Sequence, residues 1–518
     1  MKNALLSVSD KTGLIPFARA LVNAGFRLIS TGGTFRALTD AGLPVTAVDE
    51  ATGFPECFDG RVKTLHPKIH GGILYLRDSE SHAKQAGELG VEPIDMVVVN
   101  LYPFKQTILK PDCALPEAIE NIDIGGPAML RSAAKNYRFV SVLTDPADYP
   151  LVERELAQSG RVCEKTSLLL AAKVFAHTAA YDALIASYLK PLTDLPPFPE
   201  TYTVTYEKAQ DMRYGENPHQ AAAFYREILP APGALTGVKQ LHGKELSFNN
   251  INDTHGALEL LKEYEAPAVV ACKHSNPCGV GEADTIQEAY MKAYTSDPVS
   301  IFGGIVAANR EIDELIAVEI SKIFIEIILA PSYTPAALDV LTRKKNIRVL
   351  TLDNISVKQP AQAVDIKKVS GGILIQQTDG VILPDKEPVC VTKRKPSEAE
   401  IRDLMFAWKI VKYVKSNGIA IGKDGQSLGI GCGQVNRIWA ARQAIEHCEE
   451  ALGAEILQGA ALASDAFFPF PDCVEEARKA GITSIIQPGG SLKDKESIEA
   501  CDKYGIAMLF TEMRHFRH

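Results

Sequence analysis

A lysine and a histidine stand side by side where an apolar run ends. The segment AVVACKHSNPCG, residues 268–279, is typical of a buried strand, and it ends at Lys273 and His274. In a partly dry cleft, His274 could transfer a proton near neutral pH while Lys273 stabilised a developing oxyanion. The alternative is that the strand simply meets water at these residues. The pair is a candidate catalytic centre for acid–base chemistry.

Two turns near the N-terminus have the composition of a phosphate site. Ser9, Asp10 and Lys11 follow one apolar run, and the segment STGGT, residues 30–34, follows the next. At the carboxyl ends of parallel strands, helix amino termini offer unpaired N–H groups to an anion. Alternatively, Ser9 or Asp10 caps a helix and the glycines only turn the chain. Two such turns in succession favour the phosphate pocket.

The segment GRVKTLHPKIHGG, residues 60–72, is the next dense polar cluster. In an extended conformation Arg61 and Lys63 would project to one face, so both cations could contact one ligand. The alternative is an edge strand that carries charge. Because Gly71, Gly72 and a further predicted apolar strand follow, we favour a loop that lines a cleft.

Four more polar residues follow in the N-terminal region. Asn100 and Tyr102 end a strand-like run, and Asp123 precedes a predicted helix that carries Lys135. An aspartate and a lysine in one dry cleft could serve as acid and base. Alternatively, Lys135 faces solvent and Asp123 interacts with the helix dipole.

The C-terminal region has its own candidates. Arg213 and Tyr214 could bind a phosphate and stack on a base, respectively. Glu326 is the one charge within the apolar run IFIEIILA, so it needs either a substrate amine or a structural network as its partner. Phe467 and Arg514 add an aromatic ring and a cation near the C-terminus.

Alternating strands and helices must position these residues. Strand-like runs at 4–9, 26–30 and 94–102 alternate with amphipathic segments at 11–25 and 127–136, a pattern that predicts a parallel sheet with crossover helices. With 518 residues, the chain has room for two to four domains.

A proline-rich linker and an internal repeat predict the domain organisation. Residues 190–204, KPLTDLPPFPETYTV, suit an extended linker. Beyond it, PAVVACKHSNPCGVG is followed by SDPVSIFGG, and later NGIAIGKDGQSLGIGCG is followed by SDAFFPFPD. Each copy has a β-rich run that ends in a lysine, Lys273 or Lys423, so we predict two copies of one α/β unit. The predicted domains are 1–192, 200–360 and 361–518.

Composition argues against several classes of protein. The net charge of −9 disfavours a general nucleic-acid surface. Ten cysteines without a Cys-x-x-Cys pair predict neither a disulfide framework nor a structural metal site. The first apolar run is too short for a signal-peptide core, and no uninterrupted apolar stretch approaches about 18 residues. We therefore expect a cytoplasmic protein with no membrane segment.

Taken together in order, these motifs resemble one family. SVSDKTGL, STGGT, GRVKTLHPKIHGG, NLYPF, IDIGGPAMLRSAAKN, RYGENPHQ, CKHSNPCG, SDPVSIFGG, KSNGIAIG, SDAFFPFPD and MRHFRH span the whole chain. They are similar to the bifunctional purine-biosynthesis enzymes that combine 5-aminoimidazole-4-carboxamide ribonucleotide transformylase with inosine monophosphate (IMP) cyclohydrolase. The resemblance implies an α/β protein with an N-terminal methylglyoxal-synthase-like domain and two cytidine-deaminase-like units without zinc. It also implies a homodimer that shares its transformylase sites between chains.

The resemblance assigns roles to individual residues. Those that would bind the nucleotide in the N-terminal domain are Ser9, Asp10, Lys11, Thr31, Gly32, Gly33, Thr34, Arg61, Thr64 and Asn100. Ring closure would involve Lys63, Tyr102, Asp123 and Lys135. In the transformylase site, Lys273 and His274 would be catalytic, and the nucleotide would contact Arg213, Tyr214, Gly303, Glu326, Asn417, Arg437, Phe467 and Arg514. Ile438 and Asp472 would lie near 10-formyltetrahydrofolate, the implied co-substrate. Glu326 stands where some relatives have aspartate.

The expected function is therefore formyl transfer followed by dehydrative ring closure to IMP, without a metal. Two alternatives remain open at this point. A phosphosugar lyase similar to methylglyoxal synthase, joined to a separate nucleotide-binding half, would act on dihydroxyacetone phosphate without folate. A nucleotide sensor or RNA-binding module would show salt-sensitive RNA binding without turnover, but the acidic net charge disfavours it.

Overall fold

Two units make up the chain in the computed structural model, which describes residues 2–360 and 362–518. They are Met1–Tyr206 and Glu207–His518. The predicted linker ends just before this division. The predicted boundary at residue 361 falls on a residue outside the described ranges, and a further division of the second unit there stays a proposal.

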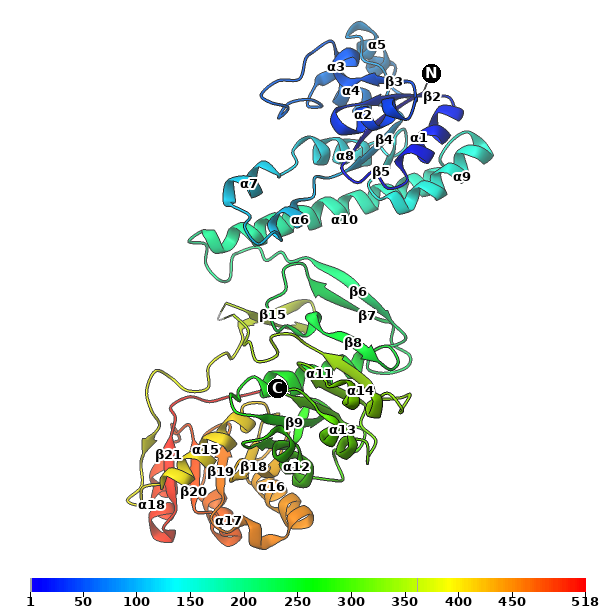
Figure 1. The fold of residues 1–518 in the computed structure, drawn as a ribbon. Coiled ribbons are helices and arrows are strands. Elements are labelled where there is room, and N and C mark those ends of the chain that lie inside the picture. The colour runs from blue at the N-terminus through cyan, green and yellow to red at the C-terminus, as the bar shows by residue number, and fades with distance from the viewer. Residues whose placement is uncertain (1, 361) are drawn as a thin grey trace. The chain divides into compact units, whose positions relative to one another are not determined.

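The first unit is built on a five-stranded parallel sheet in the order β3-β2-β1-β4-β5 (Figure 1). Its strands are β1 (Lys2–Val8), β2 (Phe26–Ser30), β3 (Val45–Ala47), β4 (Met96–Asn100) and β5 (Ser141–Leu143). The central strands carry apolar side chains that are buried on both faces, as parallel sheets require. The predicted parallel sheet is confirmed.

Ten α-helices surround this sheet in the described part of the unit. They are α1 (Leu14–Asn23), α2 (Gly32–Asp40), α3 (Val48–Thr52), α4 (Pro67–Leu74), α5 (Glu80–Glu88), α6 (Phe104–Ile108), α7 (Leu115–Glu120), α8 (Gly125–Lys135), α9 (Tyr149–Ser159) and α10 (Glu164–Leu189). One core layer packs α1 and α9 on the sheet, where the rings of Phe17 and Tyr149 stack at 4.3 Å. The other layer packs α4, α8 and α10.

The chain turns at Arg61 and Lys63, which agrees with the favoured loop, but two details predicted for the segment 60–72 are wrong. Arg61 and Lys63 do not lie on an extended strand, because three left-handed residues, Phe58 (φ 54°), Asp59 (φ 53°) and Gly60 (φ 88°), turn the chain just before them.

The apolar strand predicted after Gly71 and Gly72 is also absent, since both glycines lie inside α4. His66 caps this helix by accepting a hydrogen bond from Lys68 N, and Pro67 fills its first position. Ile69 and Ile73 are buried four residues apart, which is a helical spacing.

Helix α10 is long and apolar. The stretch Glu164–Leu192 has a window with mean hydropathy 1.4 and would be long enough to cross a membrane by length and composition alone. A third of that window (33%) is buried inside the protein, where α10 packs against α8 and β5. A core helix of a soluble protein passes the same test, so this is weak evidence for a membrane segment.

A twelve-stranded sheet organises the second unit, in the order β16-β21-β20-β19-β17-β18-β10-β9-β11-β12-β13-β8. Strands outside the repeat described below are β6 (Tyr206–Met212), β7 (Ala222–Glu227), β8 (Lys239–His242), β14 (Val364–Val369), β15 (Gly372–Gln377) and β16 (Val389–Cys390). β6 pairs with β7, and β14 pairs with β15, in two separate two-stranded sheets.

The rest of this sheet consists of two copies of one α/β arrangement. The first copy is α11 (Phe248–Leu261), β9 (Ala268–Lys273), β10 (Asn276–Glu282), α12 (Ile286–Ser296), β11 (Ile305–Ala308), α13 (Glu314–Ile320), β12 (Ile327–Ala330), α14 (Pro335–Leu341) and β13 (Arg348–Thr351). The second is α15 (Glu398–Val411), β17 (Ile419–Lys423), β18 (Gln426–Gly431), α16 (Arg437–Leu452), β19 (Ala461–Ser464), α17 (Asp472–Ala480), β20 (Ser484–Gln487), α18 (Asp494–Tyr504) and β21 (Ala507–Phe510).

In both copies a helix is followed by an antiparallel hairpin and then by three parallel strands, and the copies join where β10 meets β18. The repeat predicted from the sequence is confirmed in this element order, although the Ser-Asp part of the match is not. Ser296 ends a helix, whereas Ser464 ends a strand. A likeness of each copy to cytidine deaminases stays a prediction.

Glycines at matching positions allow a helix to lie directly on the second strand of each hairpin. A side-chain carbon on Gly279 or Gly281 of β10 would come within 2.0 Å or 2.1 Å of a carbonyl oxygen of α12. On Gly429 or Gly431 of β18 it would come within 1.9 Å of a carbonyl oxygen of α16. Since no side chain fits in this space, the contact requires glycine.

Substitution of one of these glycines should destabilise the second unit. We expect Gly431→Ala to lower the free energy of unfolding by about 2 kcal/mol or more, because the new methyl group overlaps the Ala440 carbonyl. The control is Gly380→Ala, whose side-chain carbon would lie 4.0 Å from its nearest neighbour. Urea unfolding followed by tryptophan fluorescence reports on this unit, because both tryptophans, Trp408 and Trp439, lie in it. Equal midpoints for the two variants would contradict the packing argument.

Two candidate active sites

The first site lies at the carboxyl edge of the five-stranded sheet, where Asn100 at the end of β4 holds the loop that follows β1. Asn100 Oδ1 accepts hydrogen bonds from the backbone N–H groups of Ser9 (2.6 Å) and Asp10 (2.9 Å). Asn100 Nδ2 donates to the Asp10 carbonyl at 3.1 Å, and Ser9 Oγ donates to the Leu101 carbonyl at 2.6 Å. One amide side chain therefore fixes the first predicted phosphate loop.

Two lysine amines converge on the start of α2. A side-chain carbon on Gly33 would lie 3.7 Å from Lys11 Nζ, and one on Gly32 would lie 3.9 Å from Lys63 Nζ. Thr31 precedes the helix in an extended conformation, and its side chain makes no capping hydrogen bond. Free N–H groups, the positive end of the helix dipole and two ammonium groups form an anion site.

Thr34 supports this site from within. Its hydroxyl accepts a hydrogen bond from Val8 N at 2.9 Å and donates to the Val8 carbonyl at 3.0 Å, so the second loop is fixed to the end of β1.

Arg61 and Lys63 have separate carboxylate partners. Arg61 forms an exposed ion pair with Glu120 of α7 at 2.7 Å. Lys63 Nζ lies 3.2 Å from Glu56 in the preceding turn. Of the two cations, only Lys63 lies near the start of α2, so Arg61 and Lys63 do not meet at one point.

Asp123 occupies the amino-terminal end of α8. Its Oδ1 accepts from Gly126 N at 2.8 Å, its Oδ2 accepts from Tyr102 N at 3.3 Å, and its own N–H donates to Tyr181 Oη of α10 at 2.9 Å. Desolvation by burial raises the pKa of Asp123 above its usual 3.8, although the two backbone N–H groups act in the opposite direction. The Thr64 hydroxyl lies at the same place, 2.8 Å from where a side-chain carbon on Gly125 would be.

Lys135 lies away from this group. It ends α8, ten residues after Gly125, which corresponds to about 15 Å along the helix axis. Its side chain is exposed. The structure thus brings Lys63, Thr64, Tyr102 and Asp123 towards one edge but not Lys135, whose role in ring closure stays a prediction.

The second site is built on the hairpin between β9 and β10. His274 (φ 53°) and Ser275 (φ 60°) form a tight left-handed turn of the kind that two-residue hairpins need. Ser275 Oγ lies 3.1 Å from Asp253 Oδ1 of α11, to which it donates. Lys273 Nζ donates to the Phe302 carbonyl at 2.9 Å. Lys273 is half-buried and His274 is exposed.

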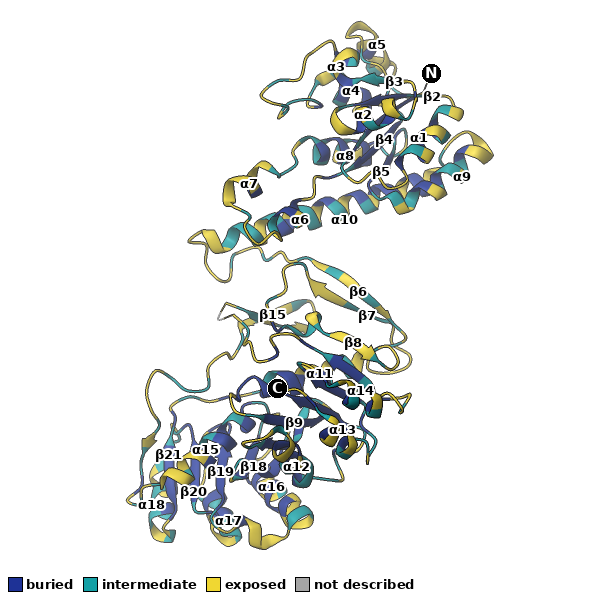
Figure 2. Cartoon of the chain, viewed as in Figure 1, coloured by how far each residue is buried: buried dark blue, intermediate teal, exposed yellow. Residues whose placement is uncertain are grey.

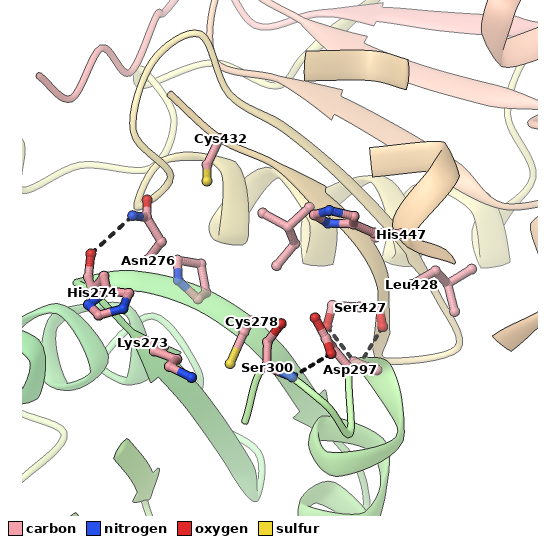
Figure 3. A pocket seen from close by; sticks show the side chains of 14 residues that line it. Lys273, His274, Asn276, Cys278, Asp297, Ser300, Ser427, Leu428, Cys432 and His447 are labelled. Carbon is pink, nitrogen blue, oxygen red and sulfur yellow. Dashed lines mark hydrogen bonds between the residues drawn. The ribbon is translucent and has the colours of Figure 1, made fainter. Parts of the chain in front are cut away.

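A cavity of ≈ 240 Å³ opens beside this turn (Figure 3). β10 and β18 pair at Gly281 and Gln426. Residues of both strands form the walls of the cavity. It is lined by Lys273, His274, Asn276, Pro277, Cys278, Ser296, Asp297, Ser300, Ser427, Leu428, Gly429, Ile430, Cys432 and His447. Lys273 and His274 therefore border a cavity large enough for a small molecule.

Arg437 at the start of α16 organises a second polar cluster. It is 5% exposed and forms an ion pair with the fully buried Asp465. It donates to Asn417 Oδ1 at 2.6 Å and to Ser464 Oγ at 2.8 Å. The C-terminal tail joins here, because His515 N donates to the Asp465 carbonyl at 3.0 Å. The sequence analysis did not name Asp465 as a site residue. The signal that could have identified it is the Ser-Asp pair that follows an apolar run.

The two clusters are adjacent in the second unit. Lys415 N, two residues before Asn417, donates to Asn276 Oδ1 at 3.2 Å, and Asn276 Nδ2 donates to the His274 carbonyl at 3.1 Å. The predicted residues Ile438 and Asp472 lie in the first turn of α16 and at the start of α17.

The remaining predicted contacts lie around these clusters. Arg213 donates to Tyr214 Oη at 3.0 Å, and the turn that contains them reaches α11 through the hydrogen bond from Asn249 to the Glu216 carbonyl. Phe467 is 38% exposed, and the Arg514 guanidinium lies 4.7 Å from the Phe516 ring.

Gly303 and Glu326 are held by neighbouring segments. Gly303 (φ 71°) donates its N–H to the Phe324 carbonyl at 2.7 Å. Glu326 pairs with Arg348 at 2.6 Å, so it already has a structural partner. A contact between Glu326 and substrate stays a prediction.

Within residues 2–360 and 362–518, no group of three or more His, Cys, Asp or Glu side chains is arranged to hold a metal ion, and all ten cysteines are free.

The anion site at α2 can be tested directly with inorganic phosphate. We expect Lys11→Met and Lys63→Met each to weaken phosphate binding about tenfold, because each removes a charge-assisted contact worth about 1.4 kcal/mol. Lys84→Met is the matched control, since Lys84 is exposed and its described ion pair is with Glu88. Isothermal titration calorimetry measures the three affinities. Equal weakening by Lys84→Met would show that only the net charge matters.

Comparison with known proteins shows the family to which the chain is similar. A model of the MGS-like domain matches residues 13–128, and a model of the AICARFT/IMPCHase bienzyme matches residues 133–447. Proteins described as "Bifunctional purine biosynthesis protein PurH" are 59% identical in Ruminiclostridium cellulolyticum and 58% identical in Acetivibrio thermocellus, each over 518 residues and 100% of both chains. A solved structure, "Crystal structure of ForH", is 41% identical over 36% of this chain and 96% of that chain, with a TM-score of 0.32 that supports no further argument.

Proposed function

The chain belongs to the AICARFT/IMPCHase bienzyme family, and from this premise we propose how its two sites divide the work. The enzyme catalyses the last two steps of IMP synthesis. It transfers a formyl group to 5-aminoimidazole-4-carboxamide ribonucleotide and then closes the ring with loss of water. The observation that carries this conclusion is identity of 59% over the full length of a bifunctional relative. A phosphosugar lyase would not account for the match over 133–447.

Ring closure belongs to the first unit in this proposal. The phosphate of the formylated nucleotide binds at the start of α2, between Lys11 and Lys63, on loops held by Asn100 and Thr34. Because the carboxamide nitrogen and the formyl carbon belong to one molecule, the step mainly needs a correct rotamer and charge stabilisation. Lys63 stabilises the oxyanion that forms as the new N–C bond is made. Asp123 takes the proton that the attacking nitrogen loses and passes it to the oxyanion, which becomes a hydroxyl. This hydroxyl leaves as water with a second proton, which balances the proton lost from the former formamide nitrogen.

Formyl transfer belongs to the second unit. The amine of the ribonucleotide is a poor nucleophile, because its lone pair is delocalised into the imidazole and carboxamide, so catalysis depends on orientation and proton management. Lys273 stabilises the oxyanion formed when the amine attacks the formyl carbon. His274 carries the proton from that amine to N10 of the departing tetrahydrofolate. The co-substrate is 10-formyltetrahydrofolate, placed near Ile438 and Asp472.

The nucleotide in the second site has charged and aromatic partners of its own. Arg437 and Asn417 are already fixed to each other. Phe467 and Arg514 lie on segments that meet through the hydrogen bond from His515 N to the Asp465 carbonyl. Arg213 and Tyr214 add a cation and a ring. As in the family pattern, we propose a cytoplasmic homodimer in which these groups complete the Lys273 site across two chains, with no nucleic-acid partner.

Separate variants should remove separate activities. We expect His274→Ala to lower formyl transfer about 10²- to 10⁴-fold and to leave ring closure within twofold, because proton transfer by a positioned side chain has that magnitude. Lys63→Met should do the reverse. Each variant is assayed with the aminoimidazole substrate and then with its formylated product, so each is the control for the other. Loss of both activities in either variant would refute separable sites.

The same assay decides the role of Lys135. The resemblance predicts that Lys135→Ala loses ring closure, whereas its exposed position at the far end of α8 favours a smaller loss than Lys63→Met gives. A loss as large as that of Lys63→Met would assign Lys135 a direct part in ring closure.

Ring closure should also depend on the protonation of Asp123. Since burial raises the pKa of Asp123 above 3.8, and the carboxylate is the form that accepts the proton, kcat/KM should fall as the pH falls through this raised pKa. A kcat/KM profile of ring closure from about pH 4 to pH 9 measures it. Asp123→Asn should abolish the reaction across the range, whereas His274→Ala should keep the acid limb unchanged. A profile that rises towards acid would contradict the assigned direction of proton transfer.

A further inference from the structure

Residues 511–518 form a C-terminal tail that leaves the buried strand β21 and runs to the end of the chain without helix or strand (Figure 2). Two backbone hydrogen bonds hold this tail against the polar cluster of the second site. His515 N donates to the Asp465 carbonyl at 3.0 Å, and Ser416 N donates to the Arg517 carbonyl at 2.9 Å. The tail therefore lies beside the groups that are assigned above to the nucleotide.

The side chain of His515 points inward from this tail and is 0% exposed. Its Nδ1 lies 2.5 Å from Asp379 Oδ2, and its Nε2 lies 3.2 Å from the Ile382 carbonyl oxygen. Because a carboxylate and a carbonyl oxygen both accept, each ring nitrogen carries a hydrogen and donates it. His515 is thus an imidazolium that forms an ion pair with Asp379.

The fold alone does not require this ion pair. The His515 ring lies 5.0 Å from the Trp408 ring, and Trp408 Nε1 donates to the same Ile382 carbonyl at 2.7 Å. That carbonyl would keep a partner without the histidine, and Asp379, which is 48% exposed, would be hydrated. An apolar side chain at position 515 would pack on the indole without desolvating a charge. What the histidine positions therefore explains it better than the stability that it adds.

The residue that His515 positions is its neighbour, Arg514. In an extended chain successive side chains point to opposite faces, so an inward His515 directs Arg514 and Phe516 outward. Both are exposed, and the guanidinium lies 4.7 Å from the Phe516 ring. No hydrogen bond or ion pair from residues 2–360 or 362–518 holds this guanidinium, so its direction depends on the backbone that His515 anchors.

We propose that His515 is a positioning residue for formyl transfer. Anchored by Asp379, it holds the C-terminal tail so that the Arg514 guanidinium faces the anionic nucleotide. This inference rests on the proposed function, in which Arg514 binds the nucleotide. The buried ring of His515 itself does not touch the substrate. Its loss therefore weakens nucleotide binding and leaves the chemical step in place.

Steady-state kinetics of formyl transfer test this role. His515→Leu should raise the KM for the aminoimidazole ribonucleotide at least tenfold and leave kcat within threefold, because a misplaced guanidinium loses a charge-assisted contact. Asp379→Asn should raise the KM less, since its amide oxygen still accepts a hydrogen bond. The matched control is His242→Leu, which removes a histidine–carbonyl hydrogen bond of 3.3 Å elsewhere in the second unit and should leave both constants within twofold.

The variant Arg514→Met separates positioning from a general loss of structure. If His515 acts through Arg514, H515L/R514M should have the KM of R514M within threefold. An unchanged KM in H515L, a fall in kcat alone, or effects of the two substitutions that multiply would each overturn the proposal. If H515L does not fold, as judged by its urea transition, D379N and D379N/R514M decide the question in the same way.

Calorimetry distinguishes failure of this inference from failure of the proposed function. The aminoimidazole ribonucleotide is titrated into K63M and K63M/H515L, because Lys63→Met weakens binding at the first site. At least tenfold weaker binding by K63M/H515L supports the positioning role even without formyl transfer, whose absence in the wild type would contradict only the proposed function. Equal affinities of the two proteins would overturn the positioning role.

Discussion

The contact of helix backbone on glycine strands is the constraint on which the second site depends. Gly279 and Gly281 let α12 lie on β10, and Gly429 and Gly431 let α16 lie on β18. These two strands carry the junction between the repeats, and each one begins directly after a hairpin turn. With bulkier residues the helices would have to move outwards, and the cavity walls from β10 and β18 would move with them. The packing of helices on these four glycines therefore determines the positions of Lys273 and His274.

Duplication of the fold did not duplicate the chemistry. The first hairpin turns at His274 and Ser275, and the second turns at Asp424 (φ 51°) and Gly425 (φ 70°) with the same left-handed backbone. A lysine ends the first strand of both, but only the first copy follows it with a histidine. The second copy instead provides the buried Arg437 with Asp465, a pair suited to fixing a polar surface. In the proposed mechanism, one repeat supplies proton transfer and the other supplies anchoring groups.

The sequence predicted the structure correctly where the spacing of apolar residues and the order of strands and helices along the chain determine it. The strands that precede Ser9, Thr31 and Asn100 are short apolar runs, and their parallel order brings the loops after them to one edge. It failed between residues 60 and 72, because a run of left-handed residues and a proline-started helix override the alternation read there. The Ser-Asp pair made Asp465 visible in the sequence, but its role was not, since that role comes from Arg437, a partner 28 positions away. Lys135 shows a second limit of sequence reasoning. It lies in the same motif as Asp123, but the residues between them form α8, which places the two side chains at opposite ends of the helix.

The central claim is that one chain carries out formyl transfer and ring closure in succession. The most direct test supplies the purified wild-type protein with 5-aminoimidazole-4-carboxamide ribonucleotide and 10-formyltetrahydrofolate while tetrahydrofolate and IMP are followed together. The account predicts that both products appear in equal final amounts and that neither forms when the folate is omitted. Release of tetrahydrofolate without IMP, or consumption of neither substrate, would contradict it.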